Sequence, residues 1–436
     1  MNDGTLIICL LVSLPWLGAL ASRVFWSNPI QLKRACVAWS VVSLAAVVAL
    51  STQLAIPPEG LLPLYLLPLT ATISLLGQPP HADHRQSWVI TLLLLGLGLC
   101  VLIAPLMVGS VALLVLFALI AFLLHRHHSV LWPMSWWGIG IYGLGALCTL
   151  CALVPDPTVA SVSALVASAV LLPLMPFHAG HLTAMTRLPG NLPSFIVLLL
   201  PLVGLHELVT ALATIPDVVA ETVGLLALVG AFYGAVKALA QTRVRLLLAY
   251  ASLSFFSILW WFAAATRSAT PRAALLVGTV GLATSGLLVA WQVVRTRYGD
   301  DVDPQAVSGL ASGMPQFSVI LSLIGLAAMG LPPFGVFAGF MGLLLSAPFP
   351  SSGGLVITLL AWLAASWYIM RMVQGLLFGL RRPELRYIDV LRTEFAALVI
   401  VVLVLLALGL APATLFTPDQ TVTTTYSAMG SVVWTR

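Results

Sequence analysis

The chain has 436 residues, of which 60% are hydrophobic and 8% are charged, and its formal net charge is +5 at pH 7. Soluble globular proteins carry about 25% charged residues, so this composition excludes soluble enzymes, nucleic-acid binders and secreted disulfide scaffolds as descriptions of the whole chain. It predicts an all-α, polytopic membrane protein whose basic residues bear on membrane orientation and on contact with anionic headgroups.

Apolar runs of about 20 residues, the length of a helix that spans a bilayer, follow one another along the chain. They lack the alternating pattern of a β-barrel. We therefore expect a single transmembrane domain over residues 1–436, built from about 12–14 membrane-spanning helices. The expected helices occupy residues 4–22, 35–55, 60–77, 87–104, 106–124, 131–153, 158–177, 192–213, 219–241, 244–265, 273–294, 316–332, 336–348, 354–378 and 391–411.

Prolines interrupt two of these runs, one near Pro173–Pro176 and the other near Gly330–Pro333. Proline removes an amide donor and clashes with the preceding turn, at a cost of about 3 kcal/mol or more inside a regular helix. We therefore expect a broken helix at each place. Broken helices are tolerated in a membrane where protein or water satisfies the exposed backbone groups, often along ion paths.

The longest polar stretch covers residues 295–314 and is expected to be a loop, not a domain. The sequence contains no Gly-rich phosphate loop, no zinc-type Cys/His set and no soluble catalytic module. Cys148 and Cys151 form a CxxC inside an apolar run without nearby ligands, so we expect a buried, inert pair. The sequence thus predicts no metal, no cofactor and no catalytic residue, and leaves open whether the chain is a non-catalytic subunit of an enzyme.

Lys237 is the first candidate for a proton path, because the chain has only two lysines and the other, Lys33, is expected in a loop. Lys237, Gln241 and Arg245 would share one face if their helix continued. A desolvated lysine can load and release protons near neutral pH. Alternatively, Lys237 extends its ammonium to the membrane surface or forms a structural ion pair.

Histidines and one glutamate complete the candidate proton path. His206 and Glu207 lie inside an apolar run, where Glu207 is expected either to pair with Lys237 or Arg245 or to be solvated near a helix end. His178 and His181 flank the first predicted break and could share a face and a water chain.

Three segments occur in order between residues 172 and 345: LMPFHAGHLTAMTRLPGNLPS, GAFYGAVKALAQTRVRLLLAYASLS and SGLASGMPQFSVILSLIGLAAMGLPPFGVFAGFMGLL. Taken together, they resemble the antiporter-like membrane subunits of respiratory complex I and of the multi-subunit cation/proton antiporters. The resemblance implies a fourteen-helix body, with the family-like core at about residues 106–378, and a mid-membrane row of Lys, Glu and His that carries protons.

The sequence departs from the family at that row. Residues 87–153 contain no Asp or Glu, so the family's acidic residue there has no counterpart. The family's other polar positions correspond here to Leu171, Leu202, Arg243, Arg245, Phe255 and Phe340. The resemblance therefore supports the fold more strongly than the usual proton chemistry.

Three functions remain open from the sequence. The first is an ion-coupled subunit that moves H⁺ or a monovalent cation along a rearranged path for a partner such as a respiratory module. The second is a proton-inert membrane anchor. The third is a version of either that pairs with a carbonic-anhydrase-like subunit in inorganic-carbon uptake, with the zinc on the partner. Each implies partner subunits, membrane or peripheral, in the bacterial cytoplasmic (inner) membrane, and no nucleic acid.

Overall fold

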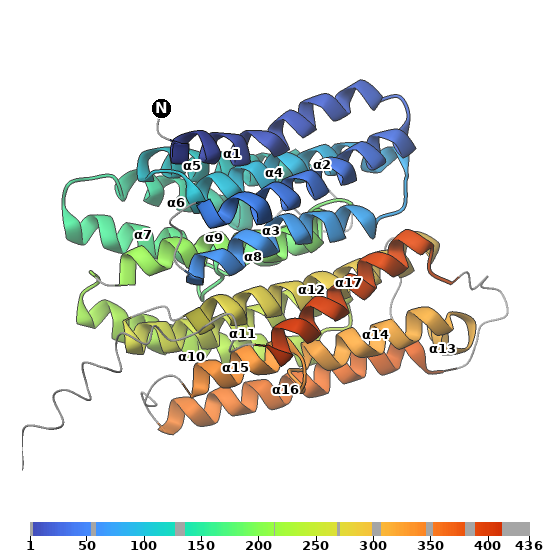
Figure 1. Ribbon diagram of the computed structural model, residues 1–436. Coiled ribbons are helices and arrows are strands. Elements are labelled where there is room, and N and C mark those ends of the chain that lie inside the picture. The colour runs from blue at the N-terminus through green and yellow to red at the C-terminus, as the bar shows by residue number, and fades with distance from the viewer. Residues whose placement is uncertain are drawn as a thin grey trace, which may run out of the picture.

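The computed structural model describes residues 3–53, 58–126, 136–212, 214–267, 271–298, 307–345, 352–379 and 389–411. These residues form an all-α bundle without a strand (Figure 1). The helices are α1 (Asp3–Ser22), η1 (Arg23–Phe25), α2 (Pro29–Leu50), η2 (Ser51–Gln53), α3 (Pro58–Leu76), η3 (Ala82–His84), α4 (Arg85–Ile103), α5 (Leu106–Arg126), α6 (Trp136–Cys151), α7 (Pro157–Leu171), α8 (Ala179–Arg187), α9 (Leu192–Leu212), α10 (Asp217–Ala240), α11 (Val244–Thr266), α12 (Pro271–Tyr298), α13 (Leu310–Gly313), α14 (Pro315–Ala328), α15 (Gly335–Leu344), α16 (Ser352–Leu377) and α17 (Arg392–Leu410).

Ten of the described helices are long and apolar enough to cross a membrane. The shorter apolar helices α3, α6, α7, α14 and α15 supply the remaining crossings, in which α7 continues into α8 and α14 into α15. When each pair counts as one interrupted crossing, the described residues make fourteen, and the all-α polytopic bundle expected from the sequence is confirmed.

Both predicted helix breaks are confirmed. Residues 172–178 separate α7 from α8 around Pro173 and Pro176, and residues 329–334 separate α14 from α15 around Pro332 and Pro333. At the second break Gly330 has φ +73°, a left-handed conformation that suits glycine, and a Cβ there would lie 2.7 Å from the Trp362 ring nitrogen.

Local signals begin several helices. Asn28 accepts a hydrogen bond from the Ile30 amide at 3.1 Å and precedes Pro29 in the first turn of α2. Asp156 accepts one from the Thr158 amide at 2.8 Å and likewise precedes a proline, at the start of α7. Such an N-cap satisfies amides that have no partner within the helix.

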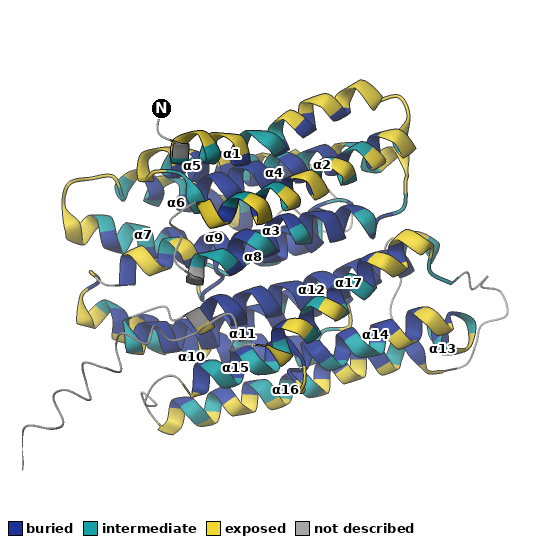
Figure 2. Cartoon of the chain, viewed as in Figure 1, coloured by how far each residue is buried: buried dark blue, intermediate teal, exposed yellow. Residues whose placement is uncertain are grey.

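The bundle has two layers, α1–α9 and α10–α17 (Figure 1). One large apolar core lies within α1–α9, and a second joins α10–α17 to residues of α3, α7, α8 and α9. Across this junction α12 packs directly against α3 and α9. α12 is buried along its membrane-spanning length, whereas α1, α2 and α16 expose one side (Figure 2). The exposed sides carry large apolar residues, as a lipid-facing surface requires.

Basic residues gather at one end of the bundle, which we name the basic end and which lies to the right in Figure 1. Of the described Lys and Arg residues, Arg267 and Arg272 lie at the opposite end. Those at or near the basic end are Arg23, Lys33, Arg34, Arg85, Arg126, Arg187, Lys237, Arg243, Arg245, Arg295, Arg297, Arg371 and Arg392.

The polar stretch at residues 295–314 is not wholly a loop. Its first four residues continue α12 to Tyr298, and Leu310–Gly313 form the short helix α13. Residues 299–306 lie outside the described part of the chain. The single-domain assignment and the core boundaries stay predictions.

Candidate functional site

Lys237 is exposed, contrary to the buried position that a proton relay would need. It lies in the last turn of α10, with its ammonium 5.7 Å from the centre of the Tyr233 ring. The helix does not continue, because α10 ends at Ala240 and α11 begins at Val244. Lys237, Gln241 and Arg245 therefore do not share one helical face, and the surface position of Lys237 matches the alternative in which its stem reaches the interface.

Glu207 does not pair with Lys237. Glu207 lies fifteen residues into α9, counted from the basic end, whereas Lys237 lies three residues from that end of α10. At a rise of 1.5 Å per residue the two are about 18 Å apart along the membrane normal. His206 is exposed and Glu207 half-buried on the outside of α9, so the structure does not bring these two residues to His178 and His181.

The first helix break does bring His178 and His181 together with α10 and α11. His181 is buried, and its Nε2 lies 2.9 Å from the Ser252 Oγ of α11. The Nδ1 atoms of both histidines are buried without a hydrogen-bond partner among the described residues. The His178 ring meets the Tyr233 ring edge-on at 5.5 Å, so a line of polar side chains reaches from Lys237 toward the centre of the bundle.

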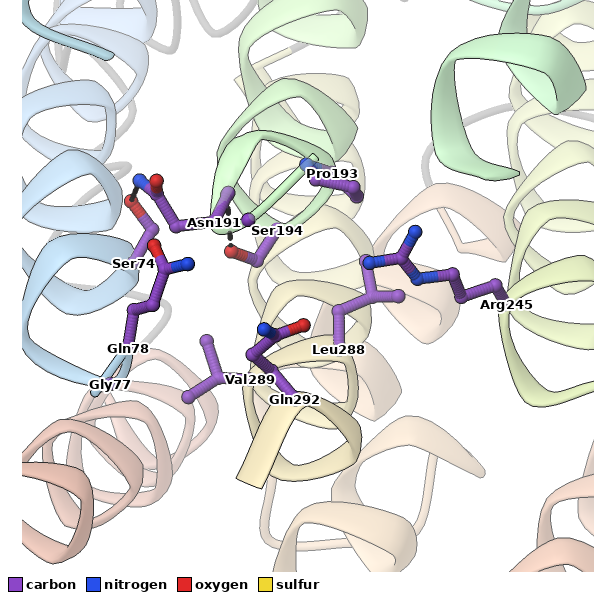
Figure 3. Close-up of a pocket in the computed structure, with 11 residues that line it drawn as sticks. Ser74, Gly77, Gln78, Asn191, Pro193, Ser194, Arg245, Leu288, Val289 and Gln292 are labelled. Carbon is purple, nitrogen blue, oxygen red and sulfur yellow. Dashed lines mark hydrogen bonds between the residues drawn. The ribbon is translucent and has the colours of Figure 1, made fainter. Parts of the chain in front are cut away.

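A second polar site joins the two layers near the basic end (Figure 3). A cavity of about 10 Å³ is lined by polar side chains of Ser74, Gln78, Asn191, Ser194, Arg245 and Gln292. Such a volume is at the lower limit for one water molecule. The Gln78 Nε2 and the Asn191 Oδ1, one donor and one acceptor, are buried without a described partner. The site can therefore hold one water molecule between them.

Backbone conformation positions Asn191 in this site. Gly190 has φ +61°, and a Cβ there would lie 2.6 Å from the Ser87 Oγ and 2.8 Å from the Gln78 Nε2. The Asn191 amide then donates to the hydroxyl oxygens of Thr91 at 2.8 Å and Ser74 at 3.2 Å. Arg245 donates to backbone carbonyls at the end of α8, those of Thr186 at 3.3 Å and Leu188 at 3.4 Å.

Lys33 is not in a loop, as the sequence suggested, but buried in the first turns of α2, with 7% of its surface exposed. Its ammonium donates to the carbonyls of Leu76, at 3.1 Å, and Gln78, at the end of α3. These carbonyls have no partner within the helix, so Lys33 caps α3 and complements its dipole. The Asn28–Pro29 start signal would have placed Lys33 inside a helix.

A buried ion pair at the basic end was also missed. The Arg297 guanidinium lies 2.7 Å from the Glu394 Oε2, with side-chain exposures of 12% and 1%. Glu394 also accepts a hydrogen bond from the Leu391 amide at 2.9 Å, and it lies within electrostatic range of Lys33. A glutamate at the start of an apolar run is a known N-terminal helix signal, but its buried arginine partner lies 97 positions away in the sequence.

Apolar side chains fill most of the positions at which the resemblance implies proton carriers. Leu171 and Leu202 are fully buried, Phe340 is fully buried against Trp362 with ring centres 4.6 Å apart, and Phe255 is 4% exposed. Among the described Asp and Glu residues, only Glu394 is buried, and it lies at the basic end. No group of three His, Cys, Asp or Glu residues suited to a metal occurs in the described ranges.

A profile of the family described as "NADH:quinone oxidoreductase/Mrp antiporter, TM" matches residues 150–364. This region contains both helix breaks and His178 and His181, whereas the second polar site also takes Ser74 and Gln78 from outside it. Over these residues, just under half of the chain, the sequence is similar to this family. The chain is 27% identical over 280 residues to NADH-quinone oxidoreductase subunit M of Escherichia coli K12, covering 61% of this chain and 53% of that protein. It is 26% identical over 251 residues to F(420)H(2) dehydrogenase subunit M of Methanosarcina mazei, covering 55% and 50%. The match spans about half the length of these curated relatives.

Solved structures show the same fold over almost the whole chain. A chain of respiratory complex I from Thermus thermophilus superposes with a TM-score of 0.75 at 20% identity, covering 94% of this chain and 96% of that one. A chain of an archaeal membrane-bound sulfane sulfur reductase gives 0.78 at 16% identity, covering 94% and 95%. The chain therefore shares the helix architecture of these structures, although its sequence differs widely from theirs.

Proposed function

We propose that this chain is a membrane-scaffold subunit of a multi-subunit, complex I-like assembly and carries no complete proton path of its own. The observation that supports this most directly is the apolar filling at Leu171, Leu202, Phe255 and Phe340. A side chain without a titratable group cannot accept or release a proton, and close packing leaves little room for a water chain in its place. The buried Glu394 supports the same proposal, because it is held by Arg297 at one end of the bundle.

A second candidate is an ion-coupled subunit with a shortened path, one of the three functions that the sequence leaves open. The observations that favour it are the two unpartnered Nδ1 atoms of His178 and His181 and the His181–Ser252 contact at the broken helix. Histidine is the side chain that exchanges protons most readily near neutral pH. Arg245 and the water-sized cavity lie nearer the basic end than these histidines.

The orientation follows from the positive-inside rule, under which short cytoplasmic loops carry an excess of Lys and Arg. We place the basic end on the cytoplasmic side of a bacterial inner membrane. Most of the described Lys and Arg residues lie at or near that end, whereas Arg267 and Arg272 lie at the opposite end. A cysteine introduced at Arg34, at the basic end, should react with a membrane-impermeant maleimide in inverted vesicles and not in right-side-out ones. The reverse labelling pattern would overturn this orientation.

Partners are the third part of the proposal, because the relatives are named as subunits of larger enzymes. Affinity purification of the tagged chain in mild detergent should recover further subunits. Iron and labile sulfide in the recovered complex would identify a respiratory module, whereas zinc in a large peripheral subunit would identify an inorganic-carbon uptake complex. A monodisperse chain without companions would refute the hetero-oligomer.

Proton movement separates the two candidate functions. We expect liposomes that contain this chain alone to take up no more H⁺ under a K⁺/valinomycin potential than protein-free liposomes do. We also expect His181→Phe to leave the H⁺ coupling of the assembled complex unchanged, provided that the thermal unfolding temperature and the subunit composition match the wild type. Loss of coupling in a complex that is still intact would favour the ion-coupled candidate and overturn the scaffold.

A further inference from the structure

An open groove of about 480 Å³ lies at the basic end, away from both polar sites described above. Its floor is the first half of α4, which packs against α1 on one side and against α5 on the other. Arg23 and Trp26, which follow α1, form one wall, and the end of α5 forms the other.

The groove changes from polar to apolar with depth in the membrane. On α4, Gln86 begins the lining face and Val89, Ile90 and Leu93 continue it at helical spacing. From Gln86 to Leu93 this face extends about 10 Å along the membrane normal. A ligand that fits must therefore have a polar end at the membrane surface and an apolar part that points into the bilayer.

The α5 wall repeats this gradient in the opposite chain direction. Leu119, Phe122, Leu123 and Arg126 line the groove at helical spacing, with Arg126 in the last turn of α5. Phe122 leaves 55% of its surface exposed, so apolar surface is open to an apolar ligand below the guanidinium.

The rim of the groove carries two positive charges. Arg23 and Arg126 are both exposed, and no Asp or Glu is among the lining residues. Within the described residues neither guanidinium forms an ion pair or donates a side-chain hydrogen bond. Trp26 completes the rim, and tryptophan is enriched at the headgroup level of membranes.

We propose that this groove binds an anionic phospholipid of the leaflet at the basic end. The phosphate lies between Arg23 and Arg126, and one acyl chain runs along the apolar faces of α4 and α5. A transmembrane helix of a partner fits less well, because the two rim arginines call for an anion at the membrane surface, which a lipid phosphate supplies.

The test compares how well the purified protein, in whatever complex it forms, retains two lipids with identical acyl chains, phosphatidylglycerol and phosphatidylcholine. Native mass spectrometry is the readout. We expect the wild type to retain phosphatidylglycerol preferentially. Each basic residue near an anionic membrane surface contributes roughly fivefold to binding, so Arg23→Gln with Arg126→Gln should weaken the preference roughly 25-fold.

The matched control is Arg34→Gln, which removes one exposed guanidinium at the same end but outside the groove; it should keep the preference. Leu119→Trp, which fills the groove but keeps both arginines, should reduce retention of either lipid. Equal loss in Arg34→Gln, or equal retention of the two lipids by the wild type, would refute the site. Displacement of the lipid by millimolar inorganic phosphate would refute an acyl-chain site, as would a photocrosslink from position 119 to another protein chain.

Discussion

The buried Arg297–Glu394 pair gives the sharpest stability prediction. Glu394→Gln keeps the shape of the side chain but leaves the Arg297 guanidinium, 12% exposed, without its carboxylate. Removing one partner of a buried ion pair costs about 3–5 kcal/mol, because the remaining charge stays desolvated. The substitution also removes a negative charge within electrostatic range of Lys33, so the loss should lie toward the upper part of that range.

The assay is thermal unfolding of the purified protein in mild detergent, followed by the decay of its monodisperse peak in size-exclusion chromatography. At roughly 2 °C per kcal/mol for a large chain, Glu394→Gln should lower the unfolding temperature by about 8–10 °C. Glu221→Gln, an exposed acid on α10, is the control and should change it by less than about 1 °C. Replacing both partners, Arg297→Met with Glu394→Leu, should recover most of the loss, since an apolar pair needs no counter-charge. A single variant as stable as the wild type, or a double variant no better than the single one, would refute the reasoning.

Three further substitutions test the site. Gly190→Ala should destabilise the protein by about 1–3 kcal/mol in the same unfolding assay, because φ is +61° and the new Cβ meets Ser87, whereas Gly140→Ala meets no atom within 4 Å and should not. Lys33→Met should lower the free energy of unfolding by about 2–4 kcal/mol, because carbonyls at the end of α3 lose their donor. The same variant should be cleaved faster by proteases between α3 and α4, and an unchanged digestion rate would contradict the capping role. Lys237→Gln should leave subunit assembly and the activity of the complex within experimental error, since its ammonium is exposed; complete loss of activity would restore the relay hypothesis.

The sequence by itself determined the membrane class, the helices and both breaks. In lipid, the backbone N–H and C=O groups of an apolar run find hydrogen-bond partners when the run forms a helix. The length and composition of each run therefore decide where the helices lie. Pro173 and Pro332 act through local sterics, which do not depend on the tertiary environment. The family resemblance likewise rests on short local segments around these breaks.

Only the tertiary structure decided which charged residues are buried and which of them meet. Lys237 lies in an apolar sequence but on the outside of α10, because burial depends on which face of a helix its neighbours cover. Lys33 and Glu394 sit beside polar residues in the sequence, yet both are buried where α3 ends and α17 begins. Their partners come from distant segments, and hydrophobic periodicity carries no information about which helix ends meet. The candidate site at the junction of the two layers therefore became visible only from the packing.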